Sequence, residues 1–222
     1  MVVDIYKRAF DYMRKNFADS ILFIISSVLL GFLSIVLPIL GVIIYSYFYP
    51  NVVSWYYTKV TGDNINPDYK TSFKSLLIPN LLASIGMVII LYSVSYIPVL
   101  TEYMNLFGSI GYQYVSYNPT LIFIGWAIII ISAILSILLL YTFYGSILGK
   151  VNKLSIYFEK SLILFAYILL YSMIVLLVLF IIDIIYSLVI SINYGAMIFT
   201  ILSIIFLVPT VTLVALLKAQ EL

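Results

Sequence analysis

The sequence predicts an all-α, polytopic membrane protein, with six transmembrane spans and an amphipathic helix before them. Hydrophobic residues make up 64% of its 222 residues and charged residues only 9%, whereas a soluble domain is roughly 25% charged. Residues 20–58 carry no charge and are interrupted by Pro38. The Lys and Arg residues all fall in segments that six spans place on one side. We therefore treat residues 1–222 as a single membrane domain.

The first segment, residues 1–19, has the pattern of an interfacial helix. Its apolar side chains recur at spacings of three and four, which places them on one helical face: Tyr6, Phe10, Met13 and Phe17. Acidic residues stand four positions before basic ones on the other face, an order that supports a helix in water. Such a helix is expected to lie in the membrane interface, with an ordinary solvated helix as the alternative.

Residues 20–58 are too long for one span. A single helix would be about 58 Å long, and the hydrocarbon core of a bilayer is about 30 Å thick. We predict two spans, over about 20–37 and 39–58, with a hinge at Pro38 and Gly41. Ser27 and Gly31 offer a close-packing face on the first span. The second carries aromatic residues typical of an interfacial belt: Tyr45, Tyr47, Phe48, Tyr49, Trp55, Tyr56 and Tyr57.

The remaining apolar segments predict four further spans. They cover about 76–100, 121–144, 161–190 and 196–217. Residues 101–120 form the longest connection. Gly145 and Gly149, at the edge of the fourth span, are either a helix-packing pair or the entry to a loop. Pro209 is expected to kink the last span and is a candidate hinge.

The basic residues predict the orientation. With six spans, residues 1–19, 59–75, 150–160 and 218–222 share one side and hold all 11 Lys and Arg residues. Cytoplasmic loops carry the excess of these residues, so we expect a multi-pass protein of the plasma membrane with both termini in the cytoplasm. A single span over 20–58 would divide the basic residues between the two sides.

A short motif recurs at the start of each predicted pair of spans. It is a charged residue, a serine and two aliphatic residues, as in Asp19-Ser20-Ile21-Leu22, Lys74-Ser75-Leu76-Leu77 and Lys160-Ser161-Leu162-Ile163. The chain is then a threefold repeat of an interfacial segment and a hairpin. Serine also favours helix starts in general, which is the alternative explanation.

Two motifs carry a resemblance to known membrane domains: Lys160-Ser161-Leu162 and Pro38-Ile39-Leu40-Gly41. In layout the chain resembles poorly characterised prokaryotic, especially archaeal, six-span families related to the membrane region of some glycerophosphodiester phosphodiesterases. That resemblance implies no catalytic residue here, since the catalytic domain of those enzymes lies outside the membrane region. The chain is also similar in layout to six-span permease subunits of ATP-driven exporters.

Few side chains in the sequence are of the types that catalyse reactions or bind metals. The chain has no Cys and no His, which removes the usual thiolates, metal ligands and general bases. We predict no catalytic, cofactor-binding or metal-binding residue and no nucleic-acid partner. Asp183 is the one acid within a span, a functional candidate by default, and Asn193 is expected near it. A structural role near external water is the alternative for Asp183.

Two functions fit these observations. The first is a non-catalytic scaffold or accessory subunit that contacts the lipid bilayer, other membrane proteins or a second copy of itself. The second is a permease-like subunit of a transporter, whose ATP-binding partner is a separate chain. The sequence contains no Gly-rich loop followed by Lys-Ser/Thr that would bind ATP.

Overall fold

The computed structural model describes residues 2–96, 115–189 and 192–222. The helices and strands in these residues are α1 Val2–Lys15, α2 Phe17–Val36, α3 Pro38–Thr61, α4 Tyr69–Ser93, β1 Val94–Tyr96, β2 Val115–Tyr117, α6 Pro119–Leu138, α7 Leu140–Ile147, α8 Phe158–Val189 and α9 Ile192–Glu221. The fold is helical, as predicted, apart from the two short strands, which pair antiparallel with Ser95 opposite Ser116.

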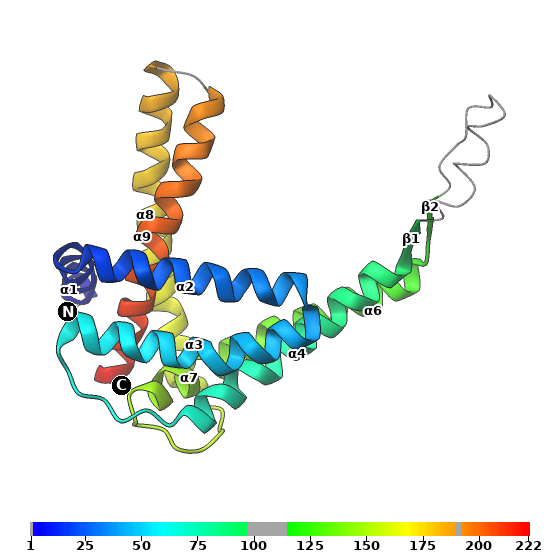
Figure 1. Ribbon diagram of the computed structural model, residues 1–222, viewed down its shortest axis with the longest axis horizontal. Helices are drawn as coiled ribbons and strands as arrows, with labels where there is room; N and C mark the ends of the chain where they lie inside the picture. Colours follow the sequence, from blue (N-terminus) through cyan, green and yellow to red (C-terminus); the bar gives the residue numbers. More distant parts are fainter. Residues whose placement is uncertain (1, 97–114, 190–191) are drawn as a thin grey trace.

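Three antiparallel helix pairs leave a common base (Figure 1). The pairs are α2/α3, α4/α6 and α8/α9. The base contains α1, α7, the connections over 62–68 and 148–157, and the C-terminal end of α9. The α8/α9 pair rises in a different direction from the other two pairs, and the turn between α2 and α3 lies at the end of its pair away from the base.

Five helical segments in the described residues have the length and composition of membrane spans. They are Phe17–Val36, Tyr69–Ser93, Pro119–Leu138, Phe158–Ile184 and Phe199–Glu221. The chain is therefore a multi-pass helical membrane protein in its overall character. Helix α3 is not among the five, because tyrosine, serine and asparagine side chains lower its hydropathy.

The turn between α2 and α3 falls at Leu37. This residue leaves the helical region, with φ −121° and ψ 78°, and Pro38 is the first residue of α3. Proline has no N–H and disfavours a helical residue before it, so it is suited to begin a helix and to end the preceding one. The turn is so tight that a Cβ atom on Gly41 would lie 2.0 Å from the carbonyl oxygen of Leu33.

Several helix limits differ from the predicted ones. Helix α1 ends at Lys15, and α2 begins at Phe17, inside the segment assigned to the interfacial helix. Helix α4 ends at Ser93, where β1 follows it, although the predicted span continues to residue 100. The part of the predicted 101–120 connection before residue 115 lies outside the described residues, as do residues 190 and 191.

The predicted span over 121–144 is broken at Leu139. Ser161, near the start of α8, places its hydroxyl group at this break. Ser161 Oγ donates to Leu138 O at 2.8 Å and accepts from Tyr141 N at 3.2 Å. These two bonds replace helical hydrogen bonds that the break removes, so α7 leaves the line of α6 at little cost in unsatisfied backbone groups.

The core lies in the base, around the last turns of α9. Residues 213–216 and Ala219 are fully buried, and helix α1 covers them with Ile5, Ala9 and Met13. Tyr56 and Tyr57 are also fully buried. Their assignment to an interfacial aromatic belt was wrong for these two residues, because Tyr56 stacks on Phe23 of α2 with 4.3 Å between ring centroids, and Tyr57 donates to Gln220 Oε1 at the end of α9 at 3.0 Å. Tyr47 and Trp55, from the same predicted belt, are exposed.

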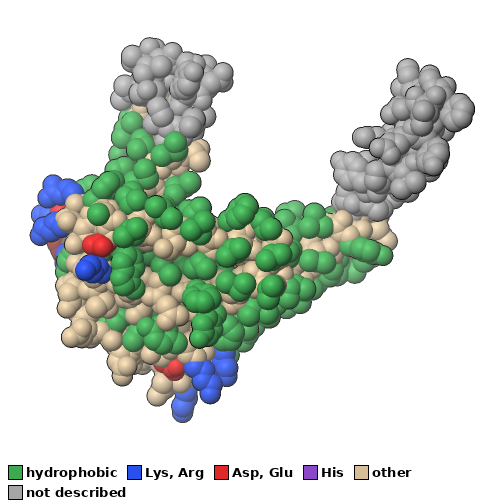
Figure 2. All heavy atoms as spheres, viewed as in Figure 1, with side chains coloured by type: hydrophobic (Ala, Val, Ile, Leu, Met, Phe, Trp, Pro, Cys, Tyr) green, Lys and Arg blue, Asp and Glu red, His purple; other side chains and the backbone are tan. Residues whose placement is uncertain are grey.

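The surface divides into a charged base and apolar arms. On the face shown in Figure 2, Lys and Arg side chains gather on α1 and on the base connections, and hydrophobic side chains cover the helix pairs. The exposed apolar residues include Phe32 and Ile35 on α2, Phe123 and Trp126 on α6, and Leu177 on α8. This distribution suits a protein whose arms lie in hydrocarbon and whose base lies in water.

Candidate functional site

The largest described cavity lies between the first two helix pairs. Its volume is about 630 Å³, which is within the usual range for small-molecule sites. Helices α2 and α4 form its walls and α3 its floor, because α2 packs on α3 without reaching α4. The lining residues are Gly31, Ser34, Ile35, Pro38, Val42, Tyr45, Asn80, Ala83, Ser84, Met87, Leu91 and Ile129.

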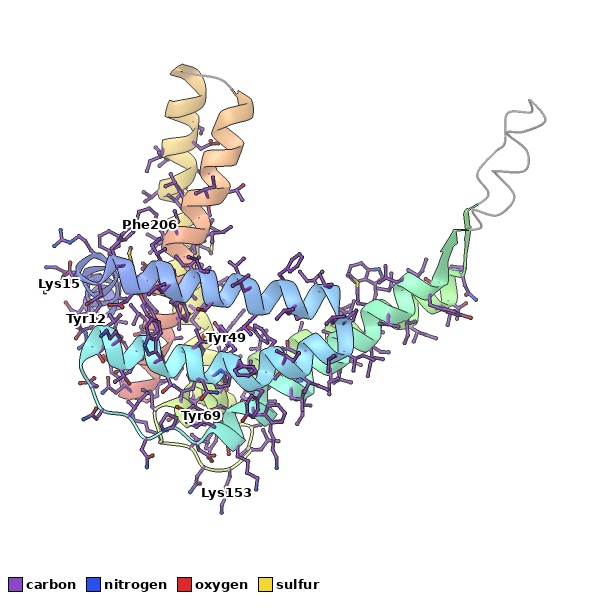
Figure 3. All side chains as sticks on the ribbon, viewed as in Figure 1. Tyr12, Lys15, Tyr49, Tyr69, Lys153 and Phe206 are labelled. Carbon is purple, nitrogen blue, oxygen red and sulfur yellow. The ribbon has the colours of Figure 1, made fainter. Side chains whose placement is uncertain are left out.

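A second, smaller cavity of about 200 Å³ continues from the first toward the base. Tyr45 and Asn80 line both cavities. The smaller one is surrounded by α3, α4, α6 and α7 and contains more hydroxyl groups, including those of Ser136 and Tyr144. Figure 3 shows Tyr49, which also lines it, in the interior of the molecule.

Asn80 is, with Tyr45, one of two polar side chains that line both cavities. Its amide group makes no hydrogen bond within the described residues, whereas other polar side chains around the cavities do: Ser84 Oγ donates to Pro38 O at 2.7 Å, and Ser136 Oγ to Ser132 O at 3.0 Å. An amide without a partner in an apolar environment costs about 1–3 kcal/mol. Asn80 is therefore the group best placed to hydrogen-bond a bound molecule.

Close contacts hold the cavity walls in place. Ser132 of α6 donates to Pro79 O at 2.7 Å, which ties α6 to α4. Gly86 and Gly125 meet where these helices cross, since a Cβ on either would lie 2.8 Å from the carbonyl oxygen of the other. Glycine pairs allow such close approach between membrane helices. Gly86 and Gly125 were missed in the sequence because they lie on different helices and no spacing relates them.

The two predicted packing residues on α2 differ in their surroundings. A Cβ on Gly31 would have no heavy atom within 4 Å, and Gly31 instead faces the larger cavity. Ser27 Oγ is buried and has no hydrogen-bond partner. Gly31 therefore makes no close helix–helix contact within the described residues.

Gly145 and Gly149 lie at the end of α7 and shape a base loop. Gly149 has φ +72°, and a Cβ there would lie 2.4 Å from Asn66 O. Gly145 O accepts hydrogen bonds from Lys150 N at 2.8 Å and Val151 N at 3.2 Å, which closes the C-terminus of the helix. These contacts are those of a loop entry, the second of the two predicted roles.

The predicted polar pair on the last two helices is placed only in part. Asp183 lies on α8, and its Oδ1 atom is buried without a hydrogen-bond partner. Asn193 is in the first turn of α9, and its side chain lies outside the described part of the chain.

Pro209 is buried within α9, which continues through it from Ile192 to Glu221. The hydroxyl groups of two threonines after the proline bond back to the helix: Thr210 donates to Phe206 O, and Thr212 to Val208 O at 2.9 Å. Such side-chain bonds help to satisfy carbonyl groups around a proline in a membrane helix.

Two lysines hold the end of α9 in the base. Lys150 Nζ donates to Ala219 O at 3.3 Å and to Gln220 O, and Lys160 Nζ donates to Leu222 O at 2.6 Å. Ammonium groups at a helix C-terminus donate hydrogen bonds to its free carbonyls, and their positive charge interacts favourably with the negative end of the helix dipole. Burial lowers the pKa of Lys150, and the charge of Lys160 lowers it further. Residues 150–160 and the end of α9 therefore lie together.

The larger cavity is suited to a molecule with a large apolar part. The larger cavity offers mainly apolar walls with Asn80 at its inner end, so it can hold an apolar group with a hydrogen-bonding end. In the residues that the structure describes, no three His, Cys, Asp or Glu side chains gather as a metal site would require.

Comparison with known proteins finds no similar chain: no protein-family model matches, and neither does any curated protein or solved structure.

Proposed function

We propose that the chain is a non-catalytic integral membrane scaffold or accessory subunit. One observation carries this proposal: the α8/α9 pair stands apart from the other helix pairs above the base (Figure 1). The faces left uncovered are apolar, with Leu169, Leu170, Met173, Ile174 and Leu177 exposed on α8. Exposed apolar surfaces of this extent indicate contact with a membrane or another protein. In our proposal, lipid and the helices of partner membrane proteins occupy the space between the arms.

Six spans are part of this proposal, with α3 as the sixth. Its 24 residues extend about 36 Å, and no charged residue precedes Lys59 in it. A span surrounded by protein needs less hydropathy than one that faces lipid, and α3 buries residues along its whole length against its neighbours. The base then lies in the cytoplasm, because it contains the basic residues, and the membrane is the plasma membrane.

The threefold repeat is also proposed. Its support is the similar position of the motif serines, since Ser20, Ser75 and Ser161 are all at most 2% exposed and each lies near the base end of its helix pair. Ser20 Oγ donates to Asn16 O at 3.0 Å and Ser75 Oγ to Ser72 O at 2.8 Å. The hydroxyls of Ser20 and Ser75 thus both bond back to a carbonyl of the preceding turn.

The permease-like alternative needs a hydrophilic path through the helices. The larger described cavity is lined mostly by apolar side chains, which favours a role in contact over a role in translocation.

Site-specific photo-crosslinking in native membranes tests the scaffold role. A photoreactive residue in place of Leu177 is expected to form adducts with a second membrane protein or a second copy of the chain, because this side chain is 61% exposed on an arm. The same residue at Lys153, in a base connection (Figure 3), is the control and is expected to give no adduct with membrane-embedded segments. Purification in mild detergent is expected to retain the same partner.

The role as a subunit would be contradicted by a chain that purifies as an isolated monomer and whose Leu177 adducts are with lipid alone.

A further inference from the structure

We propose that a pocket beside the last turns of α3 binds the phosphate headgroup of an anionic membrane lipid. The pocket has a volume of about 380 Å³ and lies between α3 and the first residue of α4. Its lining is Asn51, Ser54, Trp55, Thr58, Lys59 and Tyr69. This inference rests on the proposed position of the base at the headgroup level of the cytoplasmic leaflet.

Five of these residues form one face of α3. Their spacings of three and four place them in a single stripe along the helix, and Tyr69 meets this stripe at Ser54, to which its hydroxyl donates at 3.4 Å. Apart from Tyr69, the residues that line the pocket belong to α3 alone. Asn51, Trp55 and Lys59 are exposed, whereas Thr58 is half-buried and Ser54 is buried at the bottom of the pocket. Exposed polar groups at the end of a membrane helix require a polar occupant, because hydrocarbon would leave them unsatisfied.

The pocket offers hydrogen-bond donors and a positive charge. Lys59 is exposed and forms no ion pair within the described residues. The Thr58 hydroxyl and the Trp55 indole N–H make no hydrogen bond there either. Ser54 Oγ accepts from Tyr69 OH at 3.4 Å, so its own proton is free to be donated. Lining residues include no Asp or Glu. Donors around an unpaired ammonium group match the acceptor oxygens of a phosphate.

The length of the stripe favours a lipid over a free phosphate. Asn51 lies about 12 Å from Lys59 along the helix, deeper in the membrane than the headgroup. One N–H of the Asn51 amide donates to Tyr47 O at 2.9 Å, and its second N–H remains available. A lipid would place its phosphate at Lys59 and its glycerol oxygens nearer Asn51. Trp55 and Tyr69 are residues typical of this interface.

Lipid retention in native mass spectrometry tests this site. The full chain in mild detergent is titrated with phosphatidylglycerol, with phosphatidylcholine, and with inorganic phosphate. We expect one phosphatidylglycerol to be retained in preference to phosphatidylcholine. Lys59→Gln is expected to weaken its retention about fivefold, the effect of one basic residue near an anionic membrane surface. Lys74→Gln is the matched control: Lys74 is exposed in the base and outside the pocket, so retention is expected to be unchanged.

A second variant separates the two sources of phosphate. Asn51→Leu, at an exposed position, is expected to weaken phosphatidylglycerol and to leave inorganic phosphate binding unchanged. Inorganic phosphate that binds as tightly as the lipid, and is lost in Lys59→Gln, would replace the lipid site with a free-phosphate site. Equal losses in Lys59→Gln and Lys74→Gln would overturn the proposal, because general charge would then explain retention. A monomer that still retains the lipid would count against the scaffold role alone.

Discussion

Replacing Gly41 with alanine is expected to destabilise the first helix pair by about 3 kcal/mol or more, the upper part of the range for overpacking. The added methyl group would lie 2.0 Å from Leu33 O, 2.5 Å from Leu33 C and 2.8 Å from the Cα atom of Ser34. All three are backbone atoms, so no side-chain rotation relieves the overlap. Alanine is preferred over glycine inside a helix by about 1 kcal/mol, and a loss must therefore come from the turn. Thermal unfolding in detergent measures it.

Gly31→Ala is the matched control in the same helix pair. No heavy atom lies within 4 Å of the position that its methyl group would take, so the variant is expected to be as stable as the parent or slightly more stable. If Gly41→Ala unfolded at the same temperature as Gly31→Ala, the close approach of Gly41 to the backbone of Leu33 at this turn would be contradicted.

Gly149→Ala is expected to cost more than Gly62→Ala, at about 3 kcal/mol against about 1 kcal/mol. Both glycines have positive φ, +72° and +77°, so both substitutions carry the same backbone strain. Only at Gly149 would the methyl group overlap another residue, Asn66 O, at 2.4 Å; at Gly62 nothing lies within 4 Å. The difference between the two variants measures the contact alone. Denaturant or thermal unfolding of both, in one detergent, provides it.

This contact matters because it joins two loops that are far apart in the sequence. Asn66 follows α3, and Gly149 follows α7. Nearby, Asp68 N donates to Ser146 O at 2.8 Å, and the hydroxyl oxygens of Ser72 and Ser146 are 2.7 Å apart, within hydrogen-bond distance. Equal stabilities of the Gly149→Ala and Gly62→Ala variants would mean that these loops do not meet.

The parts of the fold that the sequence predicts correctly are those marked by patterns among neighbouring residues. An uncharged segment too long for one span, with Pro38 in its middle, indicates two helices and a turn, and α2 and α3 meet at Leu37. The amphipathic spacing of the first residues indicates α1. Such signals depend only on residues within a few helical turns, so a single sequence contains them.

The parts that could not be predicted depend on distant contacts. The break at Leu139 is stabilised by Ser161, which belongs to another helix. The burial of Tyr56 depends on Phe23 of α2 and that of Tyr57 on the end of α9, whereas their position at the end of an apolar segment is typical of an interfacial belt. Sequence patterns do not report which helix will cover such residues.

The candidate site was only partly visible in the sequence. Asn80 is recognisable as a polar residue in a predicted span. Its position between two cavities follows from the separation of α2 and α4, which no pattern in either helix indicates. Similarly, the stripe from Asn51 to Lys59 follows helical spacing, but its lack of a covering helix is a property of the assembled fold.

Single-cysteine labelling of the intact membrane tests the central claim, that all base connections lie on one side of the bilayer. The chain contains no cysteine, so variants with one cysteine at Asn64, Tyr114 or Lys153 report one position each to a membrane-impermeant thiol reagent. We expect Asn64→Cys and Lys153→Cys to react only from the cytoplasmic side and Tyr114→Cys only from outside. Labelling of Tyr114→Cys and Lys153→Cys from the same side would contradict the six-span arrangement and the functions proposed from it.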